Sequence, residues 1–242
     1  MKNKAKIIIP IALAAAAVIC AAVVLCLFYF GVLHINNPSK SVYPVRGVDV
    51  SHYQGDVDWE TLSKQGISFA FIKATEGSSY VDLTFEKNYA EANKTVLRVG
   101  AYHFFSFESS GKTQAELFIK TVKKSEKALP PVIDVEFYGA YTAKNINVKE
   151  IKKELRELVD LLTEEYGVKP IIYADDKTYE LIVKGDFSDC DLWYRSVYGA
   201  VPDGIDWTFW QYSNRHVLDG YDGGRYIDMN VYSGSEEEFS RY

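Results

Sequence analysis

Residues 131–136 read PVIDVE, residues 148–166 read VKEIKKELRELVDLLTEEY, and residues 170–175 read PIIYAD. The first and third stretches are short apolar runs that predict buried strands. The middle stretch repeats its apolar residues with a 3.6-residue period, and Asn147 with Glu150 three residues later resembles a helix cap. Strand, helix and strand in this order predict a parallel β/α unit.

The same alternation extends over most of the chain. Strands are expected at 46–55, 68–75, 96–105, 131–136 and 170–175, followed in turn by helical stretches near 58–65, 82–95, 112–127, 148–166 and 176–184. The alternation then stops, and three more strands are expected at 191–197, 206–213 and 225–232. The sequence therefore predicts an α/β fold, a TIM-like barrel with five β/α units and three closing strands.

A transmembrane helix is expected before this barrel. Three lysines lie within residues 1–6, and residues 7–33 form a run of 27 residues without a charge. Such a helix spans roughly 40 Å, more than the hydrocarbon core of about 30 Å. A cleavable signal peptide has a shorter apolar run that ends in small residues. We therefore expect an uncleaved, single-pass signal anchor in the cell membrane, with residues 1–6 in the cytoplasm because lysines precede the span.

The remaining chain is expected to lie outside the cytoplasm. Residues 34–45 contain Pro, Ser and Asn and predict a linker, which leaves residues 46–242 as one catalytic domain. Four of the 27 basic residues but none of the 33 acidic residues precede residue 46, so this domain is strongly acidic. That balance argues against nucleic acid as a partner. Cys190 is the domain's single cysteine, which excludes an internal disulfide and predicts a buried structural thiol.

Asp134 and Glu136 end the fourth expected strand. Side chains two apart in a strand point to the same face, roughly 6.6 Å apart at about 3.3 Å per residue. Two carboxyl groups held that close resist ionising together, so one tends to stay protonated near neutral pH. A protonated carboxyl group beside an ionised one is the pair of groups needed to hydrolyse a glycosidic bond. The C-terminal end of a parallel strand is also where barrel enzymes hold their chemistry.

Other acids in the chain separate into a structural pair and a functional pair. Asp58 and Glu60 have the same spacing but open a helical stretch, where Asp caps the helix and acids suit its N-terminus. Asp49 and Asp228 instead stand among apolar residues of the first and last strands. A closed barrel makes these strands neighbours, and buried charges are rare unless paired or functional. We expect Asp49 and Asp228 to meet in the catalytic site.

Aromatic residues near the expected strand ends are candidates for binding sugar. Tyr102, Tyr173, Trp193 and Trp210 offer rings for stacking, although aromatics in strands are as often core residues. Glu76, in KATEG, is expected to bind either a sugar or a loop. The histidines lack the converging ligands of a metal site, and no phosphate-binding or dinucleotide motif is present. Neither a metal nor a cofactor is expected.

The sequence resembles glycoside hydrolase family 25, the lysozymes that cut between N-acetylmuramic acid and N-acetylglucosamine. The matching stretches occur in the order found in the family and cover the domain: GVDVSHYQGDVDW (47–59), FAFIKATEG (69–77), GAYHFF (100–105), PVIDVE (131–136), IIYA (171–174), FWQYS (209–213) and YIDMNVY (226–232). The resemblance implies the same barrel of five β/α units and three closing strands. It implies peptidoglycan glycan strands as the substrate, in cell-wall remodelling or lysis.

The resemblance also implies roles for the acids. Glu136 would give its proton to the departing sugar oxygen, and Asp134 would hold and polarise a substrate acetamido group that attacks the anomeric carbon. Asp49 and Asp228 would shape the site and tune these two acids. The expected carboxylate spacing lies near the lower edge of the inverting range and does not decide between substrate assistance and inversion, although acetamido sugars favour the former.

Two other functions fit the same features. A family 18-like chitinase also places acids two apart on a barrel strand, but its longer acid run, D-x-x-D-x-D-x-E, is absent before Asp134. A membrane-tethered glycan-binding module would keep the fold without turnover, which the intact Asp134 and Glu136 argue against.

Overall fold

The chain forms two compact units, Met1–Ile35 and Asn36–Tyr242. The computed structural model describes residues 2–125 and 127–242, so Met1 of the predicted cytoplasmic segment lies outside the described residues. The first unit contains helix α1 (Lys2–Tyr29). Within α1, Ile8–Tyr29 is long and apolar enough to cross a membrane, a test of length and composition that a signal sequence also meets.

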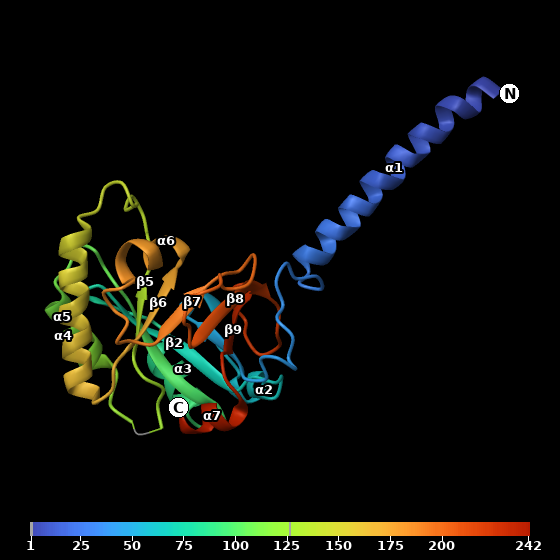
Figure 1. The fold of residues 1–242 in the computed structure, drawn as a ribbon. Helices are drawn as coiled ribbons and strands as arrows, with labels where there is room; N and C mark the ends of the chain where they lie inside the picture. The colour runs from blue at the N-terminus through green and yellow to red at the C-terminus, as the bar shows by residue number, and fades with distance from the viewer. Residues whose placement is uncertain (1, 126) are drawn as a thin grey trace. The chain divides into compact units, whose positions relative to one another are not determined.

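The second unit is a closed barrel with helices outside it (Figure 1). Its strands are β1 (Arg46–Val50), β2 (Phe69–Glu76), β4 (Arg98–Phe104), β5 (Val132–Val135), β6 (Ile171–Asp175), β7 (Leu192–Arg195), β8 (Phe209–His216) and β9 (Ile227–Tyr232), with β3 (Tyr80–Val81) as a short hairpin partner of β2. Its helices are α2 (Trp59–Ser63), α3 (Phe85–Ala92), α4 (Gly111–Thr121), α5 (Val148–Tyr166), α6 (Asp176–Thr178) and α7 (Glu236–Arg241), with a 3₁₀ turn at His52–Gln54 and a π-helical turn at Tyr179–Val183.

Strand pairing confirms the predicted barrel. Strands β1, β2, β4, β5, β6, β7 and β8 are parallel in that order, and the antiparallel β9 lies between β8 and β1 and closes the circle. Each of the first five of these strands is followed by a helix before the next, as the sequence predicts. Closure also places Asp49 directly opposite Asp228 in the register of β1 and β9. The carboxyl ends of the seven parallel strands therefore share one end of the barrel.

The structure differs from the sequence prediction mainly after the parallel strands. The helix expected near 176–184 is a single α-turn followed by a π-helical turn. The C-terminal helix α7 is an addition that the sequence did not predict. Its Phe239 packs against Phe69 and Tyr232, both of which belong to the apolar cluster inside the barrel. Helix α7 therefore closes the barrel at the end opposite the strands' carboxyl ends.

Alternation along the strands decides which residues point into the barrel. On β5 the buried cluster inside the barrel contains Val132, whereas Ile133 and Val135 belong to the cluster packed against the outer helices. Because Asp134 and Glu136 are in phase with Val132, they point inward at the carboxyl end of the barrel. The same parity holds on β6, where Ile171 and then Tyr173 belong to the inner cluster.

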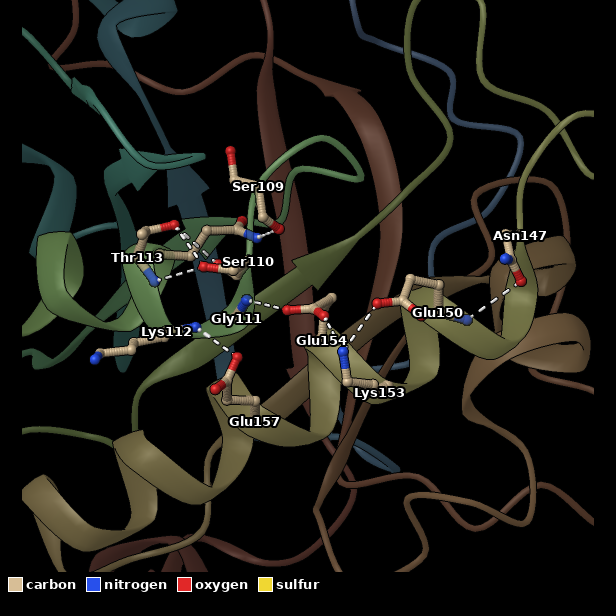
Figure 2. A network of polar contacts seen from close by, with 11 residues as sticks. Ser109, Ser110, Gly111, Lys112, Thr113, Asn147, Glu150, Lys153, Glu154 and Glu157 are labelled. Atoms are coloured by element: carbon tan, nitrogen blue, oxygen red, sulfur yellow. Dashed lines mark hydrogen bonds and ion pairs between the residues drawn. The ribbon is translucent and has the colours of Figure 1, made fainter.

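Helices α4 and α5 lie side by side on the outside of the barrel (Figure 1). Figure 2 shows that carboxylates of α5 accept hydrogen bonds from backbone amides at the start of α4, which have no partner within their own helix. The Gly111 amide donates to Glu154 Oε2 at 2.8 Å, and the Lys112 amide donates to Glu157 Oε2 at 3.0 Å. A Cβ on Gly111 would lie 2.0 Å from the Glu154 carbonyl oxygen, so only glycine fits this approach. The contact joins the helices that follow β4 and β5, which position Tyr102 and Asp134.

Candidate active site

A cavity of about 320 Å³ opens at the carboxyl end of the barrel strands. Its lining contains seven residues that the sequence predicted for the site: Asp49, Tyr102, Asp134, Glu136, Tyr173, Trp193 and Asp228. It also contains Val50, Ser51, Tyr53, Gln54, Lys73, Phe104 and Gln211. The fold thus brings four carboxyl groups from β1, β5 and β9 to one polar cavity, which is a costly arrangement unless the acids share protons or hydrogen bonds.

Asp134 and Glu136 differ in depth within this cavity. The Asp134 residue is 8% exposed, and its Oδ1 has no hydrogen-bond partner among the described residues. The Glu136 side chain is 29% exposed, and its Oε1 lies 3.5 Å from the Tyr173 hydroxyl and 3.9 Å from Arg195 Nε. Glu136 is therefore the more exposed of the two acids, and Asp134 is the more deeply buried.

Burial raises the pKa of both acids above the ordinary range of a carboxyl group. It raises the pKa of Glu136 to about 7, against the opposing charge of Arg195. Burial, followed by the charge of Glu136, also raises the pKa of Asp134 well above its usual value, while Lys73 opposes the shift. Repulsion between the two acids is therefore present, as the sequence predicts, but removal from water is the larger cause. The pair holds a proton at neutral pH, as an acid catalyst must.

The amide of Gln211 connects the acids of the first and last strands. Gln211 Nε2 donates to Asp49 Oδ2 at 2.9 Å and to Asp228 Oδ2 at 3.3 Å, and its Oε1 accepts from the Tyr173 hydroxyl at 2.9 Å. Burial raises the pKa of Asp49 to about 6. Burial and then the Asp49 charge raise the pKa of Asp228 well above its ordinary value. The two aspartates meet as predicted, with Gln211 as their shared donor.

A second amide fixes Asp49 from below. Asn230 Nδ2 donates to Asp49 Oδ2 at 2.8 Å, and Asn230 Oδ1 accepts from Trp193 Nε1 at 2.8 Å. One face of the Trp193 ring packs against Phe71 with ring centroids 4.6 Å apart. Trp193 is therefore part of the cavity floor, where it orients the amide that holds Asp49.

Comparison with known proteins identifies the family. The profile described as "Glycosyl hydrolases family 25" matches residues 48–221, well over half of the chain. The chain belongs to glycosyl hydrolase family 25. This membership decides against the family 18-like alternative. The family 25 match contains Asp49, Asp134 and Glu136 and ends before Asp228.

Family 25 proteins of known structure share the barrel. A family 25 glycosyl hydrolase from Bacillus anthracis superposes with a TM-score of 0.81 at 51% identity, over 86% of this chain and 97% of that chain. A lysozyme from Streptomyces coelicolor superposes with a TM-score of 0.72 at 30% identity, over 80% of this chain and 94% of that chain. In sequence, Lysozyme M1 of Streptomyces globisporus is 32% identical over 79% of this chain and 68% of the relative. The chain is thus a glycoside hydrolase of this family by sequence and by fold.

Two predicted sugar-binding residues lie away from the family 25 cavity. Trp210 neighbours Gln211 in β8 and points to the opposite face, where its Nε1 donates to the Ser196 carbonyl at 2.9 Å. Alternation in a strand puts only one of two adjacent side chains inside, so Trp210 does not stack on sugar in this cavity. Glu76 is also absent from the lining; it contacts the cavity through Lys73, whose Nζ lies 2.6 Å from Glu76 Oε2.

Several residues of the family 25 site were not predicted as site residues, and three of them, Gln211, Asn230 and Arg195, lie against its carboxyl groups. Gln211 and Asn230 stand within quoted motifs, FWQYS and YIDMNVY. The signal that identifies Asn230 is its spacing of two from Asp228, which puts both side chains on one face. Arg195 is in phase with Trp193 on β7 in the same way.

Two residues that the sequence predicted to be structural, Asp58 and Cys190, do not line the cavity, although Cys190 is half-buried rather than buried as expected. Asp58 caps α2, with its Oδ1 accepting from the Thr61 amide at 3.0 Å, and it does not line the cavity. Burial raises the pKa of the Cys190 thiol to about 11, so the thiol stays protonated at neutral pH. Neither residue has the environment of a catalytic group.

Proposed function

We propose that this peptidoglycan hydrolase is a 1,4-β-N-acetylmuramidase, which cleaves the bond from N-acetylmuramic acid to N-acetylglucosamine. The observation that carries the proposal is the position of Glu136, a partly exposed carboxyl group that lines the cavity together with the buried Asp134 and whose pKa burial raises to about 7. A general acid works best when its pKa lies near the working pH. The relatives named as lysozymes support the choice of substrate.

Glu136 gives its proton to the glycosidic oxygen as the bond to the anomeric carbon breaks. Asp134 accepts a hydrogen bond from the N–H of the substrate acetamido group and orients its carbonyl oxygen toward that carbon. This role is supported by Asp134 Oδ1, which is buried and accepts no hydrogen bond from the described residues. An acetamido N–H would supply the donor that this oxygen lacks. Asp49 and Asp228, held by Gln211, keep negative charge beneath the developing oxocarbenium ion.

The inverting route uses the same residues differently. There, Asp134 activates a water on the opposite face of the sugar, and the product has the inverted anomeric configuration. Proton NMR of the first product formed distinguishes the two routes, since substrate assistance retains the configuration. In either route, the sugar contacts the aromatic residues that line the cavity, namely Tyr102, Tyr173 and Trp193.

The proposal places the enzyme at the cell membrane. Residues 7–33, which include most of helix α1, form a single-pass anchor, residues 1–6 are cytoplasmic, and the barrel acts on the wall outside. The apolar composition of Ile8–Tyr29 supports this reading. Full-length protein then sediments with membranes and resists carbonate extraction, whereas a soluble form that begins near residue 34 shows cleavage instead.

Mass spectrometry of fragments released from purified peptidoglycan tests the reaction itself. A muramidase leaves reducing muramic acid ends, and a glucosaminidase leaves reducing glucosamine ends. Chitin, digested in parallel, is expected to stay intact. Reducing glucosamine ends, or binding without any release, contradicts the proposed reaction.

A further inference from the structure

Lys73 is a buried lysine of the catalytic cavity to which the proposed reaction gives no role. It lies on β2 in phase with Phe69 and Phe71, which belong to the apolar cluster inside the barrel, so its side chain points inward. Lys73 lines the cavity and is 8% exposed. A lysine is rarely buried this far unless its charge has a partner or a function.

Three neighbours fix the ammonium group of Lys73. Its Nζ donates to Glu76 Oε2 of the same strand at 2.6 Å. The same Nζ lies 5.0 Å from the centroid of the Phe104 ring and 5.7 Å from that of the Tyr80 ring, within the range of cation–π attraction. The charge is therefore held in one place at the carboxyl end of β2.

Strand register puts this charge on the Asp134 side of the cavity. Phe104 of β4, whose ring lies against Lys73, pairs directly with Asp134 of β5. Arg195 approaches from β7, on the other side of β5, and lies 3.9 Å from Glu136. Of these two cations, Lys73 lowers the pKa of Asp134 more strongly, whereas Arg195 is the one that lowers the pKa of Glu136.

The proposed reaction needs the two acids in different states. Glu136 must hold a proton, and Asp134 must be ionised to accept the acetamido N–H and to oppose the positive charge that develops there. Burial works against this distribution, because Asp134 is the more deeply buried acid and its pKa is raised well above the usual value. A positive charge on the Asp134 side favours the ionised form of Asp134.

The other ionisable groups around Asp134 do not supply this charge. They are Glu136 on its own strand, Asp49 and Asp228 from β1 and β9, Tyr102 and Tyr173 from β4 and β6, and Arg195 from β7. The carboxyl groups among them disfavour ionisation of Asp134, and Arg195 acts on it less than Lys73 does. Lys73 is therefore the main counter-charge of Asp134.

We propose that Lys73 is a positioning residue of the hydrolytic reaction, which keeps the negative charge on Asp134 so that the proton of the acid pair rests on Glu136. This inference rests on the proposed function. Glu76 then serves the site through Lys73, by holding the ammonium group in place. Loss of the Lys73 charge moves the proton toward Asp134 and impairs both acids together.

The test measures pH–rate profiles of the full chain in detergent on purified peptidoglycan. Lys73→Met removes the charge and keeps a side chain of similar length. Lys64→Met, which breaks an exposed ion pair with Glu60, is the matched control. Glu76→Gln removes the partner of Lys73 but leaves its ammonium group. Difference infrared spectra across the same pH range record the protonated carboxyl band of Asp134, which the Asp134→Asn variant identifies.

In Lys73→Met the acidic limb of the profile, where Asp134 takes up its proton, should move to higher pH. We expect a displacement of about one pH unit, which lowers the rate on that limb about tenfold, and the Asp134 band should titrate at correspondingly higher pH. Glu76→Gln should leave the limb in place or move it to lower pH, because it removes a negative charge. Lys64→Met should change neither readout.

An acidic limb and an Asp134 band that both stay in place in Lys73→Met overturn the inference. So does a Glu76→Gln variant that moves the limb to higher pH as far as Lys73→Met, because the ion pair would then act only through structure. The infrared titration does not depend on turnover. A wild-type chain that releases nothing from peptidoglycan therefore overturns the proposed function, and the position of the Asp134 band is read separately.

Discussion

Arg195 Nε lies 3.9 Å from Glu136 Oε1, so the acid that burial protonates stands beside a fixed positive charge. The two influences oppose each other: burial raises the pKa of Glu136, and the guanidinium restrains that rise. The balance leaves the pKa at about 7, where the group can both hold and release a proton. Arg195 is thus a positioning and tuning residue for the proposed acid.

Replacing Arg195 by methionine should move the upper limb of the pH–rate profile. Without the positive charge the pKa of Glu136 rises further, so the acid stays protonated to higher pH and the decline in rate begins later. Initial rates on purified peptidoglycan from pH 5 to 9 measure this shift. Lys184→Met, which breaks an exposed ion pair with Glu180, is the control and should leave the profile in place. A decline that moves to lower pH in Arg195→Met would contradict the assignment.

Substituting Asp134 separates its chemical role from that of the other D-x-E pair. Asp134→Asn keeps the shape but removes the charge that polarises the acetamido group, and turnover should fall about 10²–10³-fold. Asp58→Asn keeps a helix cap, because Asn caps nearly as well as Asp, and should leave turnover unchanged. Initial rates and thermal melting of both variants make the comparison. Equal losses of activity would remove the distinction between the two pairs.

Stability should fall as the pH rises, because Glu136 has a higher pKa folded than unfolded. Its contribution is fully present below the unfolded value, near 4.5, and is lost as the pH rises through about 7. At 1.36 kcal/mol per pKa unit, this loss is roughly 3 kcal/mol at most for Glu136 alone. Glu136→Gln cannot ionise at this position. Its melting temperature should therefore be higher than that of wild type at pH 8 and equal to it at pH 4. A variant that is less stable than wild type at pH 8 would show that Glu136 is not buried as described.

Gly111→Ala should loosen the contact between α4 and α5. The new Cβ would lie 2.0 Å from the Glu154 carbonyl oxygen, so the helices must move apart, at a cost of about 1–3 kcal/mol. Gly199→Ala meets nothing within 4 Å and is the matched control. Urea unfolding of the two variants measures the difference. Unchanged stability of Gly111→Ala would mean that the helices are less closely packed than the structure shows.

Local patterns predicted the barrel because strand alternation and helix period are properties of short segments. They also predicted that Asp49 and Asp228 meet, since barrel closure makes the first and last strands neighbours. The sequence analysis placed Trp210 wrongly because the pattern FWQYS does not show which of its side chains point into the barrel. A tryptophan is as suitable inside the barrel as on its outer face beneath a packed segment. The polar Gln211 takes the inner position, where its partners Tyr173 and Asp49 come from strands distant in sequence.

The packing of residues 36–45 against the barrel was not predictable for a related reason. Pro, Ser and Asn in residues 34–45 are typical of a linker, and composition carries no information about docking. The docked position depends on Trp207 and Trp210, more than 160 residues further along the chain, and on the missing helix between β7 and β8. Helix α7 was missed because a six-residue helix has too few turns to show a period.

The most direct measurement is the initial rate of Glu136→Gln on purified peptidoglycan, beside Glu60→Gln as the matched control. Glu136→Gln keeps the shape of the acid and removes its proton, and general acid catalysis contributes about 10²–10⁴-fold. We predict that this variant folds, still binds glycan and loses turnover by about that factor, while Glu60→Gln at the exposed start of α2 keeps the wild-type rate. A rate near wild type in Glu136→Gln would contradict the account, because another group would then be supplying the proton.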